Sequence, residues 1–247
     1  MAHLTLTPCS TGVAINLPNG ATLPIPEILG IGMNYAAHAH EQGKGVPERP
    51  VIFTKAPFSA VLSGSPIIIP KVCQDRPQVD FEAELGVVIG PPSAKHPGPV
   101  RNVPLDRALD CVLGYVAAND VSARWWQKDG SGGQFHRGKS FDTFCPLSKT
   151  LTLASEIKDP QNLRLQTFVN GVKMQDANTS DMIFNIATLI HTISQGRTLL
   201  PGTLIVTGTP SGVGFARNPQ VVLKHGDTVR VEVEGVGFTE NPVIHES

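Results

Sequence analysis

The stretch VDFEAELGVVIG, residues 79–90, joins three acids to a long apolar run. Asp80, Glu82 and Glu84 alternate with apolar residues, and GVVIG then continues without a charge. Side chains two positions apart on a strand point to the same face, roughly 6.5–7 Å apart. The pattern therefore predicts a strand that carries three carboxylates on one face and enters a hydrophobic core. Carboxylates in such a place need a cationic partner or a metal ion.

A second apolar run, YVAAND, ends in Asp120. A solvated face of an edge strand is the plain alternative for Glu82 and Glu84, but the apolar residues that follow them argue for burial. We therefore expect two strands to bring Glu82, Glu84 and Asp120 together as metal ligands. Ligand sets of oxygen atoms alone favour Mg²⁺, Mn²⁺ or Ca²⁺ over zinc. Three protein ligands leave coordination positions for water or substrate, which is typical of a catalytic metal site.

Composition excludes several classes of protein. The chain has 247 residues, a formal net charge of −1 and no strongly basic run, so nucleic acid and anionic membranes are poor partners. The 24 glycines and 21 prolines together make up about 18% of the chain, above the usual combined share of about 12%. This composition favours many short strands joined by tight turns. The four cysteines include no CxxC pair and are expected to be reduced. No signal or transit peptide is evident, so we predict a cytoplasmic protein, with a mitochondrial location left open.

Local patterns predict a mainly β chain in one domain, spanning residues 1–247, with an N-terminal β extension at 1–25 and a catalytic core at 26–245. Strands are expected at 51–55, 66–70, 79–90, 164–170 and 229–234. Helices are expected at 34–43, 105–112 and 179–196.

Three further segments carry candidate chemistry. His38 and Glu41 are three residues apart in a predicted helix and share a face, which suits a surface ion pair or a histidine made more basic by a carboxylate. Lys139 precedes an apolar strand and is either an ordinary surface lysine or a group that stabilises an oxyanion. TGTPSGVG, residues 207–214, contains glycines that allow close approach of the backbone to a ligand, but it is not a Walker loop.

Together these segments resemble the fumarylacetoacetate hydrolase family. The motifs that carry the resemblance occur in the family's order over about residues 25–245: GMNYAAHAHEQ, VIFTKAPFSAV, VDFEAELGVVIG, GYVAANDVSARWWQ, GKSFDTFCPL, VNGVKMQD and LIVTGTPSGVG. The resemblance implies a mixed β-sandwich roll like the fumarylacetoacetase C-terminal domain, with a few short helices. It also implies a homodimer and a Mg²⁺ or Mn²⁺ ion held by three carboxylates.

Matched by motif, Glu82, Glu84 and Asp120 resemble the family's metal ligands. The resemblance implies a catalytic His38–Glu41 dyad on a lid and a catalytic Lys139. It further implies that Gln127 and Thr209 contact the substrate.

Two positions depart from the family patterns. Met33 stands where the acylpyruvase branch has arginine, and Trp125 stands where an acid usually follows Ser-Ala-Arg. The first departure resembles the branch associated with oxaloacetate tautomerisation.

The main functional prediction is a Mg²⁺- or Mn²⁺-dependent hydrolase that cleaves a C–C bond in a small β-dicarbonyl or 2-oxo acid through an enolate. The alternatives are a tautomerase (isomerase) or decarboxylase acting on oxaloacetate at the same site, and a catalytically silent protein that binds a 2-oxo acid.

Overall fold

The acidic stretch is divided into two strands in the computed structural model, which describes residues 2–41, 43 and 45–247. β8 (Val79–Asp80) pairs with β12 (Ser122–Ala123), and β9 (Ala83–Ile89) pairs with β11 (Val112–Asn119). The prediction of one continuous strand over 79–90 was therefore wrong. Phe81 and Glu82 separate the two strands. Asp80 therefore belongs to the β8–β12 pair, and Glu84 belongs to the sheet that contains β9 and β11.

The fold is mainly β, as predicted, and its largest sheet has eleven strands in the described chain. Its main path runs β3 (Thr22–Pro24), β2 (Gly12–Asn16), β1 (His3–Cys9), β14 (Thr150–Leu153), β11, β9, β18 (Leu204–Val206), β4 (Ile28–Gly32) and β5 (Val51–Lys55). β13 (Cys145–Leu147) joins β11, and β6 (Ala60–Leu62) joins β13. The N-terminal strands 1–3 thus extend this sheet through the pairing of β1 with β14.

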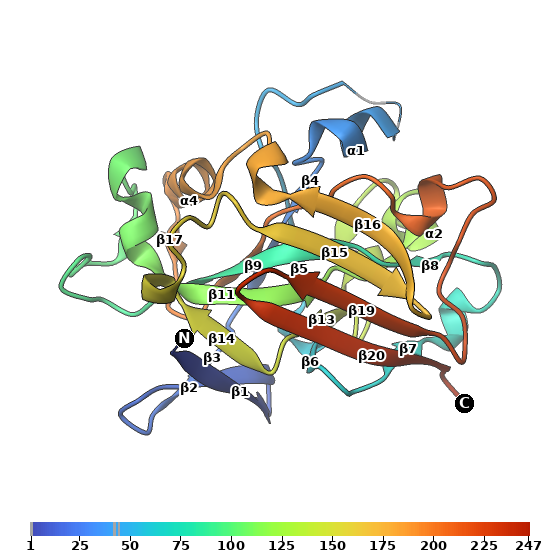
Figure 1. Ribbon diagram of the computed structural model, residues 1–247, viewed down its shortest axis with the longest axis horizontal. Helices are drawn as coiled ribbons and strands as arrows, with labels where there is room; N and C mark the ends of the chain where they lie inside the picture. The colour runs from blue at the N-terminus through green and yellow to red at the C-terminus, as the bar shows by residue number, and fades with distance from the viewer. Residues whose placement is uncertain (1, 42, 44) are drawn as a thin grey trace.

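A second sheet of five strands has the order β16 (Val172–Asn178), β15 (Arg164–Val169), β19 (Thr228–Val233), β20 (Gly237–His245) and β7 (Ile67–Ile69). It packs against β9 and β11, and in Figure 1 it crosses in front of them. A two-stranded ribbon joins β10 (Val100–Arg101) to β17 (Thr198–Leu199).

The hydrophobic core explains why β9 is apolar on both faces. Leu85 and Val87 pack toward the five-stranded sheet and α4 (Ile186–Ser194), in a cluster with Leu165 and Val231. Val88, the residue after Val87, belongs to a second cluster on the other face of the large sheet. A central strand that is covered on both faces has a continuous apolar sequence. The same two covering layers bury the neighbouring acids.

The helices are short. They are α1 (Ala36–Glu41), α2 (Arg124–Gln127), α3 (Phe135–Lys139) and α4. The segment 105–112 was predicted as a helix, and Leu105–Cys111 form a 3₁₀ helix. The predicted helix 34–43 includes Gln42, which lies outside the described residues. None of the helices in the described ranges has the length and apolar character of a membrane-spanning segment.

Candidate metal centre and active-site cavity

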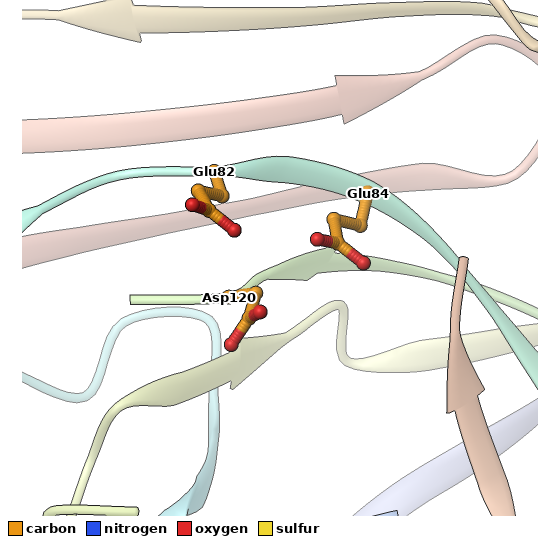
Figure 2. Close-up of side chains that lie close together, drawn as sticks. All are labelled: Glu82, Glu84 and Asp120. Atoms are coloured by element: carbon orange, nitrogen blue, oxygen red, sulfur yellow. The ribbon is translucent and has the colours of Figure 1, made fainter. Parts of the chain in front are cut away.

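Three carboxylates meet where β9 and β11 run side by side. Glu82 precedes β9, Glu84 lies in it, and Asp120 directly follows β11. The backbone N–H of Asp120 donates to the carbonyl oxygen of Glu82 at 2.9 Å, which aligns the ends of the two strands. One carboxylate oxygen from each residue lies within 4.8 Å of the others, and Figure 2 shows the three groups facing one another. The predicted trio is thus brought together at exposures of 5%, 1% and 0%.

Buried cations neutralise part of this negative charge. Lys139 Nζ, from α3, donates to Glu82 Oε2 at 2.7 Å and to Asp120 Oδ2 at 2.5 Å. Burial alone would lower the pKa of Lys139, but the charges of Asp120 and Glu82 raise it above its usual value. Lys139 is therefore a fixed ammonium ion at the acids. The prediction that it lies at the site agrees with its position.

Lys55, at the end of β5, stabilises the same arrangement. Its Nζ lies 2.6 Å from Asp120 Oδ1 and also donates to the backbone carbonyl of Lys139. The side chain is fully buried. One lysine thus orients both the carboxylate and the segment that carries the other lysine.

Asp80 does not join the three carboxylates, contrary to the expectation that Asp80, Glu82 and Glu84 share one face. It accepts from Arg124 Nε at 2.9 Å and Nη2 at 2.6 Å, and from the backbone N–H groups of Gly214 and Phe215 at 2.8 and 3.0 Å. Arg124 Nη1 in turn lies 2.6 Å from Glu82 Oε1. Asp80 therefore ties the loop after Thr209 to a cation that contacts the metal-ligand candidate Glu82.

Glu84 is the acid with the least favourable electrostatic surroundings. Its Oε2 accepts from the backbone N–H of Gly208 at 2.7 Å, in the glycine-rich segment 207–214. Burial, followed by the charges of Asp120 and Glu82, raises the pKa of Glu84 well above its usual value. Burial acts in the same direction on Glu82, but Lys139 and Arg124 together lower the pKa of Glu82. The centre is therefore short of positive charge on the Glu84 side.

The donor set fits a hard divalent cation. All three candidate ligands are carboxylates, they converge within 4.8 Å, and burial together with the charges of Asp120 and Glu82 raises the pKa of Glu84. Mg²⁺ and Mn²⁺ prefer oxygen ligands of this kind.

The predicted dyad is also formed. His38 Nδ1 lies 3.1 Å from Glu41 Oε2 within α1, and Glu41 Oε1 accepts from the backbone N–H of Gly212 at 2.9 Å. Burial opposes the shift, but the hydrogen bonds from His38 and Gly212 lower the pKa of Glu41. His38 is buried, whereas His40 on the same helix is exposed. The glycine-rich loop thus contacts both Glu84 and Glu41.

A cavity of about 660 Å³ connects these groups. Its lining includes His38, Glu82, Gln127, Lys139 and Thr209, whereas Glu84 and Asp120 lie behind this surface. Thr209 accepts a hydrogen bond from Gln175 Nε2 at 2.9 Å, and Gln127 accepts one from Arg124 Nη1 at 3.0 Å. His38, Lys139 and the two candidate substrate-contacting residues therefore share one cavity, whereas Glu41 is outside its described lining.

The two departures from the family patterns have different surroundings. Met33 lines the cavity, in a left-handed backbone conformation with φ of 55°. Trp125 is absent from the described lining and packs instead against Trp126 and under the guanidinium of Arg76.

The family comparison agrees with the motif resemblance. The sequence profile described as fumarylacetoacetate (FAA) hydrolase C-terminal matches residues 27–244. The chain belongs to the fumarylacetoacetate hydrolase family.

Among curated relatives within this hydrolase family, the mitochondrial oxaloacetate tautomerase of Xenopus laevis is 45% identical over 91% of this chain and 67% of its own length. The human mitochondrial oxaloacetate tautomerase FAHD2A is 42% identical over 88% of this chain and 66% of its own length. The chain thus spans about two thirds of the length of these relatives.

Solved structures of the family superpose along nearly the whole chain. A 5-carboxymethyl-2-hydroxymuconate delta-isomerase from Mycobacterium smegmatis is 36% identical with a TM-score of 0.77, covering 99% of this chain and 94% of that one. A fumarylpyruvate hydrolase from Pseudomonas aeruginosa, in complex with Mn²⁺ and pyruvate, is 27% identical with a TM-score of 0.81, covering 96% and 98%.

Sequence reasoning missed three residues that build this family's site here. Arg124 was noted only as the neighbour of Trp125, Asp80 was expected to share a face with the other acids, and Lys55 was not singled out. Lys55 ends the strand VIFTK, and a lysine in an apolar strand is a signal of a buried charge pair. Local pattern carries no comparable signal for the Asp80–Arg124 pair, which joins residues 44 positions apart.

Proposed function

We propose that this chain is a Mg²⁺- or Mn²⁺-dependent enzyme that interconverts the keto and enol forms of a 2-oxo acid, with oxaloacetate as its reference substrate. The observation that carries the proposal is the buried Glu82–Glu84–Asp120 cluster beside Lys139, adjoining a cavity that also contains His38. The names of the 45% and 42% identical relatives support the choice of tautomerisation.

Glu82, Glu84 and Asp120 are the residues that would hold the cation. When bound, a Mg²⁺ or Mn²⁺ ion supplies Lewis-acid polarisation of a carbonyl oxygen. The cluster of Asp80, Glu82, Glu84 and Asp120 exceeds its described buried cationic partners, Lys55, Arg124 and Lys139, by one charge. A bound divalent cation would change the net charge of this group from one negative to one positive. A positive site favours an anionic substrate such as a 2-oxo acid.

The chain's own residues would carry the proton transfer. His38 removes the proton from C3 of the keto acid, and the electron pair of that C–H bond forms the C2–C3 double bond while the C2 oxygen becomes the enolate. Lys139 stabilises the negative charge on that oxygen. Gln127 and Thr209 orient the substrate, and return of the proton to carbon or oxygen completes the interconversion. Glu41 holds the His38 imidazole in place through their contact at 3.1 Å.

Hydrolysis of a C–C bond is the second candidate. It is favoured by the His38–Glu41 contact at 3.1 Å, because a histidine oriented in this way is suited to activate water. The fumarylpyruvate hydrolase similarity also supports it. Water attacks the carbonyl carbon beyond C3 of an acylpyruvate, the C3–C4 bond breaks, and its electron pair leaves with C3 as the enolate of pyruvate. Decarboxylation of oxaloacetate would form this enolate with loss of carbon dioxide.

The test is a substrate panel on the Mg²⁺-loaded protein. Enol-to-keto conversion of oxaloacetate, followed by ultraviolet absorbance, is expected to be fast and to stop after chelation. Substitution of both Glu82→Ala and Glu84→Ala is expected to abolish metal binding and activity together, while the exposed-carboxylate variant Glu240→Gln retains both. Cleavage of acylpyruvates with no tautomerisation would favour hydrolysis instead. Oxalate binding without turnover of any substrate would identify a silent binding protein.

We also propose a homodimer, which light scattering would test. The exposed Ile52 on edge strand β5 and the exposed Phe58 just after it support an apolar contact surface.

A further inference from the structure

The cavity is much larger than oxaloacetate requires. Its volume of about 660 Å³ falls in the range of roughly 300–1,000 Å³ that is typical of pockets for drug-sized ligands. Besides the polar groups, its lining includes four apolar side chains, those of Ile31, Met33, Phe53 and Phe135. The space next to the acidic centre is therefore suited to an apolar group.

The two aromatic side chains are held by glycines in β4. A Cβ atom at Gly30 would lie 2.1 Å from Cζ of Phe53, so the ring occupies the place of a missing side chain. A Cβ atom at Gly32 would lie 3.5 Å from Phe135. The two rings are 5.5 Å apart at a tilt of 59°. GIG in β4 thus creates a preformed aromatic wall, defined here as Phe53 and Phe135.

The aromatic wall is built into the same elements as the charged centre. On β5, Phe53 and Lys55 are two positions apart and share a face. On α3, Phe135 and Lys139 are four positions apart and share a face. Lys139 Nζ lies 5.2 Å from the centroid of Phe53. A substrate atom bound at Lys139 is therefore adjacent to the aromatic wall.

Charge favours an uncharged group at this wall. Of the lysine and arginine side chains in the described lining, Arg124 and Lys139 are bound to buried carboxylates, and Lys128 is exposed and lies 5.4 Å from the ring of Phe215. We propose that the preferred substrates are 2-oxo acids whose C3 carries an uncharged aryl group, packed against Phe53 and Phe135. This inference rests on the proposed function and names its substrate class.

The test compares phenylpyruvate with pyruvate, which share the 2-oxo acid end and differ in the aryl group. Exchange of C3 protons with deuterated water, followed by NMR on the Mg²⁺-loaded protein, measures enolisation of both. We expect kcat/KM to favour phenylpyruvate, and Phe53→Ala to lower the phenylpyruvate-to-pyruvate ratio about tenfold, equivalent to about 1.4 kcal/mol, because the aryl group loses its aromatic packing partner. Phe238→Ala, at an exposed phenylalanine outside the cavity lining, is the matched control and keeps the wild-type ratio.

Calorimetric binding of both acids to the same proteins separates this inference from the proposed function. If no 2-oxo acid exchanges protons but phenylpyruvate binds more tightly in a Phe53-dependent way, the proposed function fails and the aryl subsite stands. If oxaloacetate is tautomerised but the ratio is unchanged in Phe53→Ala, the aryl subsite is overturned. If Phe53→Ala does not fold, the same phenylpyruvate-to-pyruvate ratio is measured in Phe135→Ala, with a thermal melt to verify folding.

Discussion

Lys139 Nζ lies 2.5 Å from Oδ2 of Asp120, although neither side chain is more than 2% exposed. Asp120 follows β11, and Lys139 ends α3. The ion pair gives Asp120 a cationic partner inside the protein, while Glu84 accepts from a backbone N–H group. A single buried lysine thus both stabilises the acidic centre and competes with any metal ion for its oxygens.

Lys139→Met is expected to separate metal binding from catalysis. Loss of the ammonium group removes repulsion toward a divalent cation, so Mn²⁺ affinity in calorimetry should be unchanged or higher. Enolisation of oxaloacetate should nevertheless fall by roughly 10²–10³-fold, because the enolate loses a preorganised charge. Lys149→Met, at an exposed lysine, is the control. A Lys139→Met protein with full activity would remove Lys139 from the mechanism.

Glu84→Gln tests the pH dependence of the metal-free protein. Burial and the neighbouring acids raise the pKa of Glu84 in the folded state, so its contribution to stability is present below its unfolded pKa and is lost as the pH rises through the folded value. Glu84→Gln should therefore be more stable than the wild type at about pH 8 and close to it at about pH 3, below the usual carboxyl pKa of about 4.3.

Chemical denaturation with a chelator present measures this difference. Mn²⁺ should raise the stability of the wild type and have little effect on Glu84→Gln. A stability difference that does not change with pH would contradict the raised pKa.

His38→Ala tests the base that the two candidate reactions share. General-base catalysis typically contributes about 10²–10⁴-fold in rate, so cleavage of an acylpyruvate should decrease by that factor if His38 activates water. Because His38 is also the proposed base that removes the C3 proton, enolisation of oxaloacetate should decrease by a similar factor. His40→Ala, on the exposed face of the same helix, should retain both activities. Complete loss of tautomerisation in His38→Ala, in a protein whose wild type cleaves no acylpyruvate, would leave tautomerisation as the only reaction.

Asp80→Asn should destabilise the protein strongly. It leaves the guanidinium of Arg124 buried without its main partner, which typically costs about 3–5 kcal/mol of unfolding free energy. Asp176→Asn is a close control, because Asp176 accepts from Arg164 Nε and Nη2 in the same way but at the surface. Its free energy of unfolding should stay close to that of the wild type. Equal effects of the two substitutions in urea unfolding would show that the buried pair has no special role.

By itself, the sequence determined the mainly β character of the chain, the burial of β9 and the identity of the three carboxylates that converge. These features are local: an apolar run and a two-residue alternation limit which faces can be exposed. Glu84 needed only its strand, Glu82 its place directly before that strand, and Asp120 its place at the end of another.

Only the tertiary structure decided which partners these acids have. The chain changes ladders at Phe81 and Glu82, which turns Asp80 toward Arg124 and leaves Glu84 without a described cationic partner. Lys55 reaches Asp120 across 65 positions, and no local periodicity specifies such a contact. Strand pairing between distant segments sets these distances, and at 2.5–3 Å the electrostatic energy of a buried charge depends on them more than on residue type.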